Sequence, residues 1–223
     1  MICIKNLTFK IGDKLVCNDL NLELDTHSRL AVIGRNGAGK SSLMKYIIKP
    51  LLNTIFIEEN PITKNKIDLA NVPDKYKMHY ISYSSQLSQY NSNINIENLY
   101  NLVPNKIDNQ HIQEYIDTFE LPYRQIANLS GGEAQLVYVT ACLIQNSRLI
   151  LLDEPVTYLD WVNSDKLLEL LVKRVTYYKC ALIAIMHDLY KIEKYFTHVL
   201  YLQGNGNWTL YDIKDFDYKN FKK

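Results

Sequence analysis

Residues 29–48 read RLAVIGRNGAGKSSLMKYII, and this stretch decides the fold. It opens with a compact apolar run, Arg29 to Ile33, which is typical of a buried strand. A glycine-rich loop, Gly34 to Ser41, follows at once, and then apolar residues recur at helical spacing until Pro50. The order strand, glycine loop, helix therefore predicts the start of an α/β domain.

The glycine loop fits the phosphate-loop pattern G-x-x-x-x-G-K-[ST], and it lies where that pattern has a mechanical meaning. Glycines let the backbone wrap closely around phosphates, while backbone N–H groups and the helix N-terminus attract the anion. Lys40 is expected to reach the β and γ phosphates, and Ser41 to ligate magnesium. The predicted nucleotide-binding residues of the loop are Gly34, Arg35, Asn36, Gly37, Ala38, Gly39, Lys40, Ser41 and Ser42.

The rest of the chain alternates between strand and helix patterns, which indicates a mainly parallel sheet covered on both faces. An alternating N-terminal region predicts an antiparallel β unit, and a helical pattern between residues 86 and 130 predicts a small insertion. The predicted class is therefore α/β. The further elements expected in order are helix 132–145, strand 149–152, helix 161–175, strand 181–186 and a closing hairpin around residues 204–207.

Composition excludes several classes of protein. The formal net charge of +1 over 223 residues gives no electrostatic footprint for duplex nucleic acid. The longest apolar runs are too short to cross a bilayer, and no secretory signal is visible at the start. We therefore expect a cytoplasmic protein without a nucleic-acid partner. The four scattered cysteines are expected to be buried, reduced thiols: Cys3, Cys17, Cys142 and Cys180.

Two carboxylates, Asp153 and Glu154, follow the apolar residues 149–152. Ligands of open α/β sheets bind at the carboxyl edge of the strands, so both side chains are expected there. Asp153 suits magnesium, and Glu154 suits the base for an attacking water. His187 follows the strand at 181–186 and is expected at the same edge. By itself, an acidic turn after a buried strand could equally be a solvated surface feature.

Residues 129–133 read LSGGE. Ser130 and Glu133 have the spacing of a capping box, so the segment predicts a helix start. Two bare glycines at that start would also present N–H groups to an anion. LSGGE matches the signature of the ATP-binding cassette (ABC) ATPases, and together with the phosphate loop and the acidic strand end it makes the whole chain resemble this family.

The resemblance implies a P-loop NTPase core in which two cassettes sandwich two ATP molecules. The signature residues Ser130, Gly131 and Gly132 would contact the γ-phosphate held by the other copy. Gln86 would be the Q-loop glutamine, Asp160 the D-loop aspartate and His187 the switch histidine. The implied catalytic residues are Glu154, His187, Lys40 and Gln86, and the implied magnesium ligands are Ser41, Gln86 and Asp153.

The resemblance also implies one domain over residues 1–223, with residues 1–86 and 129–223 as the core and 87–128 as a helical subdomain. That subdomain would receive a membrane permease, placing the protein peripherally on the inner face of the cell membrane. The chain looks most like importer cassettes for iron chelates, haem, cobalamin or metals. A soluble scaffold in iron–sulfur cluster assembly is the alternative, whereas a kinase would leave the signature unexplained.

The expected adenine contact departs from the family pattern. The family places an aromatic residue, which stacks on adenine, just before a glycine near the N-terminus, but here Ile11 precedes Gly12. Ile11 is the expected adenine contact, and Phe9 is the alternative. The catalytic positions are all filled, so an active cassette is expected.

Overall fold

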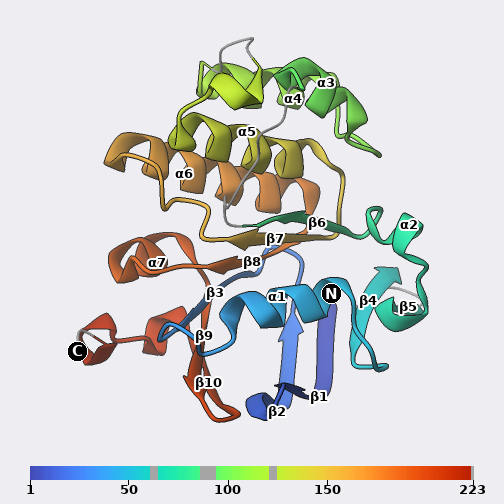
Figure 1. Ribbon diagram of the computed structural model, residues 1–223, viewed down its shortest axis with the longest axis vertical. Coiled ribbons are helices and arrows are strands. Elements are labelled where there is room, and N and C mark those ends of the chain that lie inside the picture. Colours follow the sequence, from blue (N-terminus) through green and yellow to red (C-terminus); the bar gives the residue numbers. More distant parts are fainter. Residues whose placement is uncertain (61–64, 86–93, 121–124, 222–223) are drawn as a thin grey trace.

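The computed structural model describes residues 1–60, 65–85, 94–120 and 125–221. Its strands form two sheets, one of four strands and one of six (Figure 1). The strands are β1 (Ile2–Ile11), β2 (Lys14–Leu24), β3 (Arg29–Gly34), β4 (Ile55–Asn60), β5 (Asn65–Asp68), β6 (Ile81–Ser84), β7 (Leu149–Asp153), β8 (Ala181–Ile185), β9 (His198–Gly204) and β10 (Asn207–Asp212). The α-helices are α1 (Lys40–Ile48), α2 (Asp74–Lys77), α3 (Ile96–Leu102), α4 (Asn109–Thr118), α5 (Gly131–Ile144), α6 (Trp161–Tyr178) and α7 (Leu189–Tyr195).

The six-stranded sheet has the order β10-β9-β3-β8-β7-β6, and all its pairs are parallel except β9 with β10. Successive residues of β7 enter opposite cores: Leu149 and Leu151 pack with α1, whereas Ile150 and Leu152 pack with α5 and α6. A strand buried on both faces needs apolar residues throughout, which explains its continuous apolar run. The predicted parallel sheet, covered on both faces, and the closing hairpin are confirmed.

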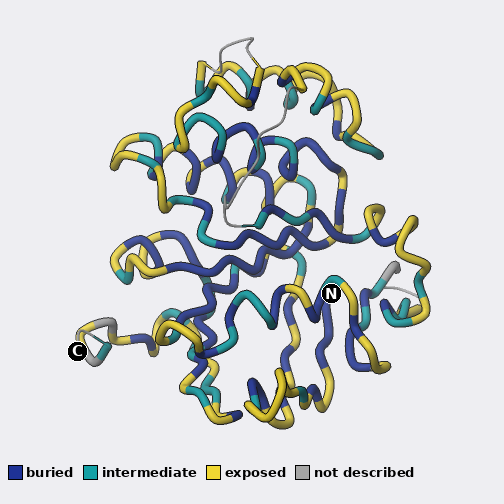
Figure 2. Tube along the Cα trace, in the orientation of Figure 1, coloured by how far each residue is buried: buried dark blue, intermediate teal, exposed yellow. Residues whose placement is uncertain are grey.

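The four-stranded sheet is antiparallel and has the order β2-β1-β4-β5. It packs with α1 below the six-stranded sheet, while α5 and α6 lie above it (Figure 1). The buried residues form two layers on either side of the central strands (Figure 2). The predicted N-terminal antiparallel unit is confirmed, and it lies on the same side of the sheet as the phosphate loop's helix.

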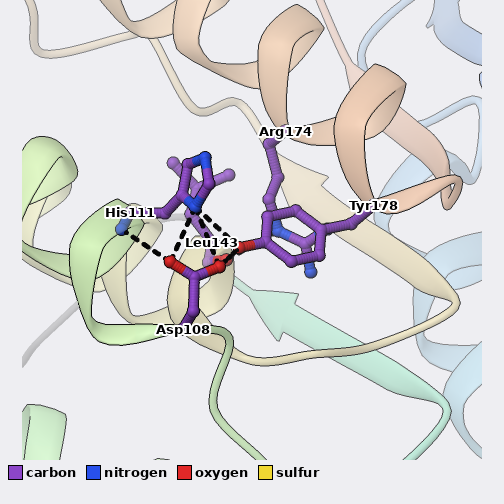
Figure 3. A network of polar contacts seen from close by, with 5 residues as sticks. All are labelled: Asp108, His111, Leu143, Arg174 and Tyr178. Atoms are coloured by element: carbon purple, nitrogen blue, oxygen red, sulfur yellow. Dashed lines mark hydrogen bonds and ion pairs between the residues drawn. The ribbon is translucent and has the colours of Figure 1, made fainter.

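A buried arginine fastens the end of α5 to α6. Arg174 of α6 is fully buried and donates from Nε to the Leu143 carbonyl at 2.8 Å (Figure 3). Its Nη2 donates to the Gln145 carbonyl, also at 2.8 Å. These are among the carbonyls that the end of α5 leaves without a helical partner, so the cation meets the negative end of the helix. The Tyr178 ring covers the guanidinium at 4.3 Å. The buried charge is thus compensated from several directions.

A polar cluster next to Arg174 attaches α4 to α6. Asp108, the N-cap of α4, accepts hydrogen bonds from the Tyr178 hydroxyl and from the His111 backbone N–H (Figure 3). His111 Nδ1 lies 2.8 Å from both Asp108 carboxylate oxygens. The hydrogen bond from Tyr178, followed by those from His111, lowers the pKa of Asp108. One carboxylate therefore caps a helix and joins it to the core.

The thiols of Cys3, Cys17, Cys142 and Cys180 are free and buried, as the sequence predicted. Burial raises the pKa of each thiol, to about 11 for Cys17 and about 12 for Cys142. At neutral pH these groups are therefore uncharged and pack as small apolar side chains. Over the described residues, no helix has the length and apolar character needed to cross a membrane.

Candidate active site

The phosphate loop joins the carboxyl end of β3 to the start of α1. Gly39 has φ 102°, and a Cβ there would lie 2.3 Å from Val16 Cγ1, so only glycine fits. The Lys40 ammonium donates to the carbonyls of Gly34, at 2.9 Å, and Arg35, at 3.2 Å. Burial lowers the pKa of Lys40, while nearby carboxylates act in the opposite direction. The ammonium is thus held next to the first two residues of the phosphate loop.

Asp153 is the last residue of β7 and is 4% exposed. Its Oδ1 is buried and has no hydrogen-bond partner among the described residues. Burial raises the pKa of Asp153, and a hydrogen bond from Ser41 opposes that rise. A buried carboxylate oxygen beside a hydroxyl provides the hard oxygen ligands that magnesium prefers. The residues Asp153 and Ser41 therefore fit a magnesium ion.

Glu154 directly follows β7, and its backbone lies in the left-handed region, with φ 53°. That conformation is uncommon for a residue other than glycine and is found at functional sites. Its Oε1 lies 2.8 Å from His187 Nε2, and its Oε2 accepts a hydrogen bond from Thr157 Oγ1 at 3.1 Å. The carboxylate is therefore oriented by two donors.

His187 lies just beyond β8, the strand next to β7. Asp153 pairs with Ile185 in the β7–β8 register, so the residues that follow each strand emerge together. The Met186 N–H donates to the Val32 carbonyl at 3.2 Å, which ties this end of β8 to β3 and hence to the phosphate loop. The structure thus brings Lys40, Asp153, Glu154 and His187 to one edge of the sheet, as the sequence predicted.

The LSGGE segment begins α5. Ser130 Oγ accepts from the Glu133 N–H at 3.2 Å, and the Glu133 carboxylate accepts from the Ser130 N–H at 2.8 Å, so the predicted capping box is confirmed. A Cβ on Gly132 would lie 2.8 Å from the Tyr158 carbonyl oxygen. This glycine is therefore required by a close backbone contact with the segment that follows Glu154.

The other predicted site residues have different surroundings. Asp160 caps α6, with its carboxylate accepting from Asn163 N at 2.8 Å and from Asn163 Nδ2 at 2.6 Å. The hydrogen bond from the Asn163 backbone is the main cause that lowers the pKa of Asp160. The structure thus gives Asp160 a local capping role, in addition to its predicted contact with nucleotide. Gln86 lies outside the described residues.

Ile11 and Phe9 differ in their availability to adenine. The Phe9 ring stacks on Tyr46, with centroids 4.7 Å apart, and belongs to the partly buried side chains around the core. Ile11 ends β1 and is 50% exposed. Ile11 is therefore the more accessible of the two side chains.

Thr157 and Lys14 are site residues that the sequence did not indicate. Thr157 holds Glu154, and the Lys14 ammonium donates to the Gly37 carbonyl of the phosphate loop. The threonine's position three residues after Glu154 is a local signal that could have suggested a turn. The lysine contact joins residues 23 positions apart and has no local signature.

The family model for ABC transporters matches residues 17–157, which include the phosphate loop, the LSGGE segment and the acidic end of β7. The chain belongs to the ABC transporter family. It is therefore an ABC-type ATPase with an ATP-binding site.

Three ABC relatives cover most of this cassette. A probable ABC transporter ATP-binding protein, p29, of Mesomycoplasma hyorhinis is 28% identical over 90% of this chain and 87% of its own length. The zinc import ATP-binding protein ZnuC of Anaplasma phagocytophilum is 27% identical over 85% of this chain and 74% of its own. A probable iron chelatin transport ATP-binding protein of Helicobacter pylori is 27% identical over 90% and 82%.

Solved ABC structures share the fold of the whole cassette. The ATP-binding subunit of an ABC transporter superposes with a TM-score of 0.79 at 22% identity, covering 99% of this chain and 93% of that one. A dimeric ATP-binding cassette in a post-hydrolysis state with ADP and Pi gives a TM-score of 0.75 at 22% identity, covering 97% and 100%. The predicted α/β class with a P-loop NTPase core is thereby confirmed.

Proposed function

We propose that this ABC cassette hydrolyses ATP at the edge formed by Lys40, Asp153, Glu154 and His187 and thereby powers import through a membrane permease. The observation that carries the proposal is the Glu154 carboxylate, oriented by His187 and Thr157 beside a buried Asp153. A general base, a metal ligand and a phosphate-binding cation on one sheet edge are the groups that phosphoryl transfer to water requires.

Each residue has a defined part in hydrolysis. Lys40 neutralises the β and γ phosphates, and Glu154 accepts a proton from the water whose oxygen forms the new bond to the γ-phosphorus as the bond to ADP breaks. His187 donates a hydrogen bond that orients Glu154 or the γ-phosphate. Ser41 and Asp153 would hold magnesium, with Gln86 as the third proposed ligand, and the ion would supply positive charge to the phosphate oxygens. Ile11 contacts adenine.

Two copies are needed to complete each site. Helix α1 packs on one face of the six-stranded sheet, and α5 packs on the other. The phosphate loop and the residues Ser130, Gly131 and Gly132 therefore start helices on opposite sides of one chain. A second copy, turned to face the first, would bring its α5 N-terminus and Asp160 to the γ-phosphate held here. We accordingly propose a homodimer, or a pair with a second cassette, that forms on ATP binding.

The permease contact falls to the helical unit at residues 87–128, which includes α3 and α4. In this arrangement Gln86 links the permease to magnesium and the γ-phosphate, and the cassette lies peripherally on the inner face of the membrane. Relatives named for zinc import and iron chelatin transport support a metal or iron-chelate importer. The alternative of an iron–sulfur assembly scaffold has no support among these relatives, which are named as transport subunits.

Purification from native membranes tests this function. The tagged protein should retain a multispanning permease, and its ATPase activity should disappear in Lys40→Ala, which removes the cation on the phosphates while the glycine loop remains. Lys45→Ala on the same helix removes the same charge outside the loop and should leave hydrolysis intact. A soluble assembly complex in place of the permease, or normal turnover in Lys40→Ala, would contradict the proposal.

A further inference from the structure

The hairpin formed by β1 and β2 touches the phosphate loop at its tip. Ile11 and Lys14 are cross-strand partners on either side of the two-residue turn at Gly12 and Asp13. From this tip the Lys14 ammonium donates to the carbonyl of Gly37, in the middle of the phosphate loop. The side chain that closes the turn is therefore attached to the loop expected to hold the phosphates.

A second contact places the same strand against the loop. Val16 is buried, and it lies so close to Gly39 that a Cβ there would be 2.3 Å from Val16 Cγ1. Lys14 and Val16 therefore both contact the loop, Lys14 at Gly37 and Val16 at Gly39. Val16 packs closely against Gly39 from two residues farther along β2, and Lys14 bonds the hairpin tip to Gly37.

Holding the tip matters because of the residue opposite Lys14. Ile11 is half exposed and offers adenine a branched aliphatic side chain in place of a ring. Dispersion contact weakens steeply with separation, and a gap of about 0.5 to 1 Å forfeits a quarter to a half of it. An aliphatic contact therefore depends on the exact placement of the hairpin tip relative to the phosphates.

We propose that Lys14 is a positioning residue for the nucleotide base: its bond to Gly37 sets the distance between the phosphate loop and Ile11, and so places Ile11 against adenine. This inference rests on the proposed binding of ATP at the phosphate loop. Lys14 acts through the loop carbonyl and the hairpin, not on the phosphates directly. Loss of Lys14 should consequently affect ligands that carry a base and spare those that do not.

Equilibrium binding of magnesium ATP and of magnesium inorganic triphosphate to Lys14→Met tests the proposal. Affinity for ATP should fall by about three- to tenfold, while affinity for triphosphate stays unchanged. Lys10→Met is the matched control, since Lys10 is an exposed lysine on the same hairpin and its loss changes the charge equally. It should alter neither affinity. Lys14→Arg keeps a donor of similar reach and should restore most of the ATP affinity.

The other outcomes are equally decisive. An equal loss of ATP and triphosphate affinity in Lys14→Met would mean that Lys14 contacts the phosphates itself, and it would overturn the positioning role. Unchanged affinity for both ligands would overturn it as well, because the contact with Gly37 would then be incidental. Failure of the native protein to bind either ligand would instead contradict the proposed function at the phosphate loop.

Discussion

His187 Nε2 lies 2.8 Å from Glu154 Oε1, and this contact joins residues that follow two neighbouring parallel strands. The two residues meet because the segments that follow β7 and β8 emerge at the same edge of the sheet. At that edge the backbone of Glu154 is in the left-handed region. The carboxylate that would take a proton from water is thus positioned by a partner on the next strand.

His187→Ala should slow hydrolysis with little change in ATP binding. The change removes a donor that orients Glu154, and loss of one such preorganised donor typically costs about 100-fold in kcat. Thr157→Val removes the other donor and should have a smaller effect, because His187 still orients the carboxylate. Steady-state kinetics check both variants. A rise in KM with unchanged kcat would contradict the assignment, since it would place His187 in nucleotide binding only.

Asp153→Asn should stabilise the fold in the absence of magnesium while abolishing turnover. Burial raises the pKa of Asp153 above its unfolded value, so the ionised carboxylate destabilises the folded state, increasingly as pH rises through the interval between the two pKa values. A neutral amide removes that penalty, which for a buried unpaired group is about 1 to 3 kcal/mol. Urea unfolding in EDTA at pH 7 measures the difference. A destabilised variant would mean that Asp153 is well compensated in the magnesium-free protein.

Gly132→Ala should impair ATP-dependent dimerisation far more than Gly131→Ala. A Cβ at residue 132 would lie 2.8 Å from the Tyr158 carbonyl and force the tip of α5 to shift, whereas one at residue 131 would meet Tyr158 side-chain atoms at an ordinary 3.8 Å. Light scattering with and without ATP checks the pair. Equal dimerisation of both variants would show that the backbone contact at Gly132 does not set the position of the tip.

Lowering the pH should selectively weaken the attachment of α4. Hydrogen bonds from Tyr178 and then His111 hold the pKa of Asp108 below its unfolded value of about 4, so its stabilising effect is full above that value and is lost as the pH falls below it. Asp108→Asn should therefore be less stable than the native protein at pH 7, with the gap narrowing on acidification. Urea unfolding at pH 7, and again below the unfolded pKa of Asp108, measures the difference in stability between the two proteins. A constant gap would exclude ionisation of Asp108 as its source.

Much of the fold follows from local patterns. Residues 30–33 of β3, 149–152 of β7 and 181–185 of β8 are all apolar because both faces of these strands are buried, and this pattern predicted their central position. The strands β4, β5 and β6 and the short helix α7 were not predicted. Helix α7 has only seven residues and begins at the Asp188 cap, so its apolar residues are too few to establish a helical period.

The candidate site was predictable where its residues follow a strand or start a helix, as with Asp153, His187 and Ser130. Contacts between distant segments were not. The Phe9 ring could have faced adenine, but its stacking on Tyr46 of α1 became evident only once β1 and α1 were packed together. The contact of Lys14 with Gly37 depends in the same way on the hairpin meeting the loop. Such tertiary contacts have no period in the sequence.

Glu154→Gln gives the most direct test of an ATPase that works as a sandwich dimer. The amide keeps the shape of the side chain but cannot accept the proton from water. Lys40, Ser41 and Asp153 still hold the phosphates and magnesium, so binding is retained while cleavage stops.

Size-exclusion chromatography of Glu154→Gln with saturating ATP and magnesium measures the outcome. The account predicts a stable dimer that forms only with ATP, together with loss of hydrolysis, and it predicts that adding Ser130→Arg returns the protein to a monomer by blocking the facing site. A Glu154→Gln protein that stays monomeric under saturating ATP, or that hydrolyses ATP at the native rate, would contradict it.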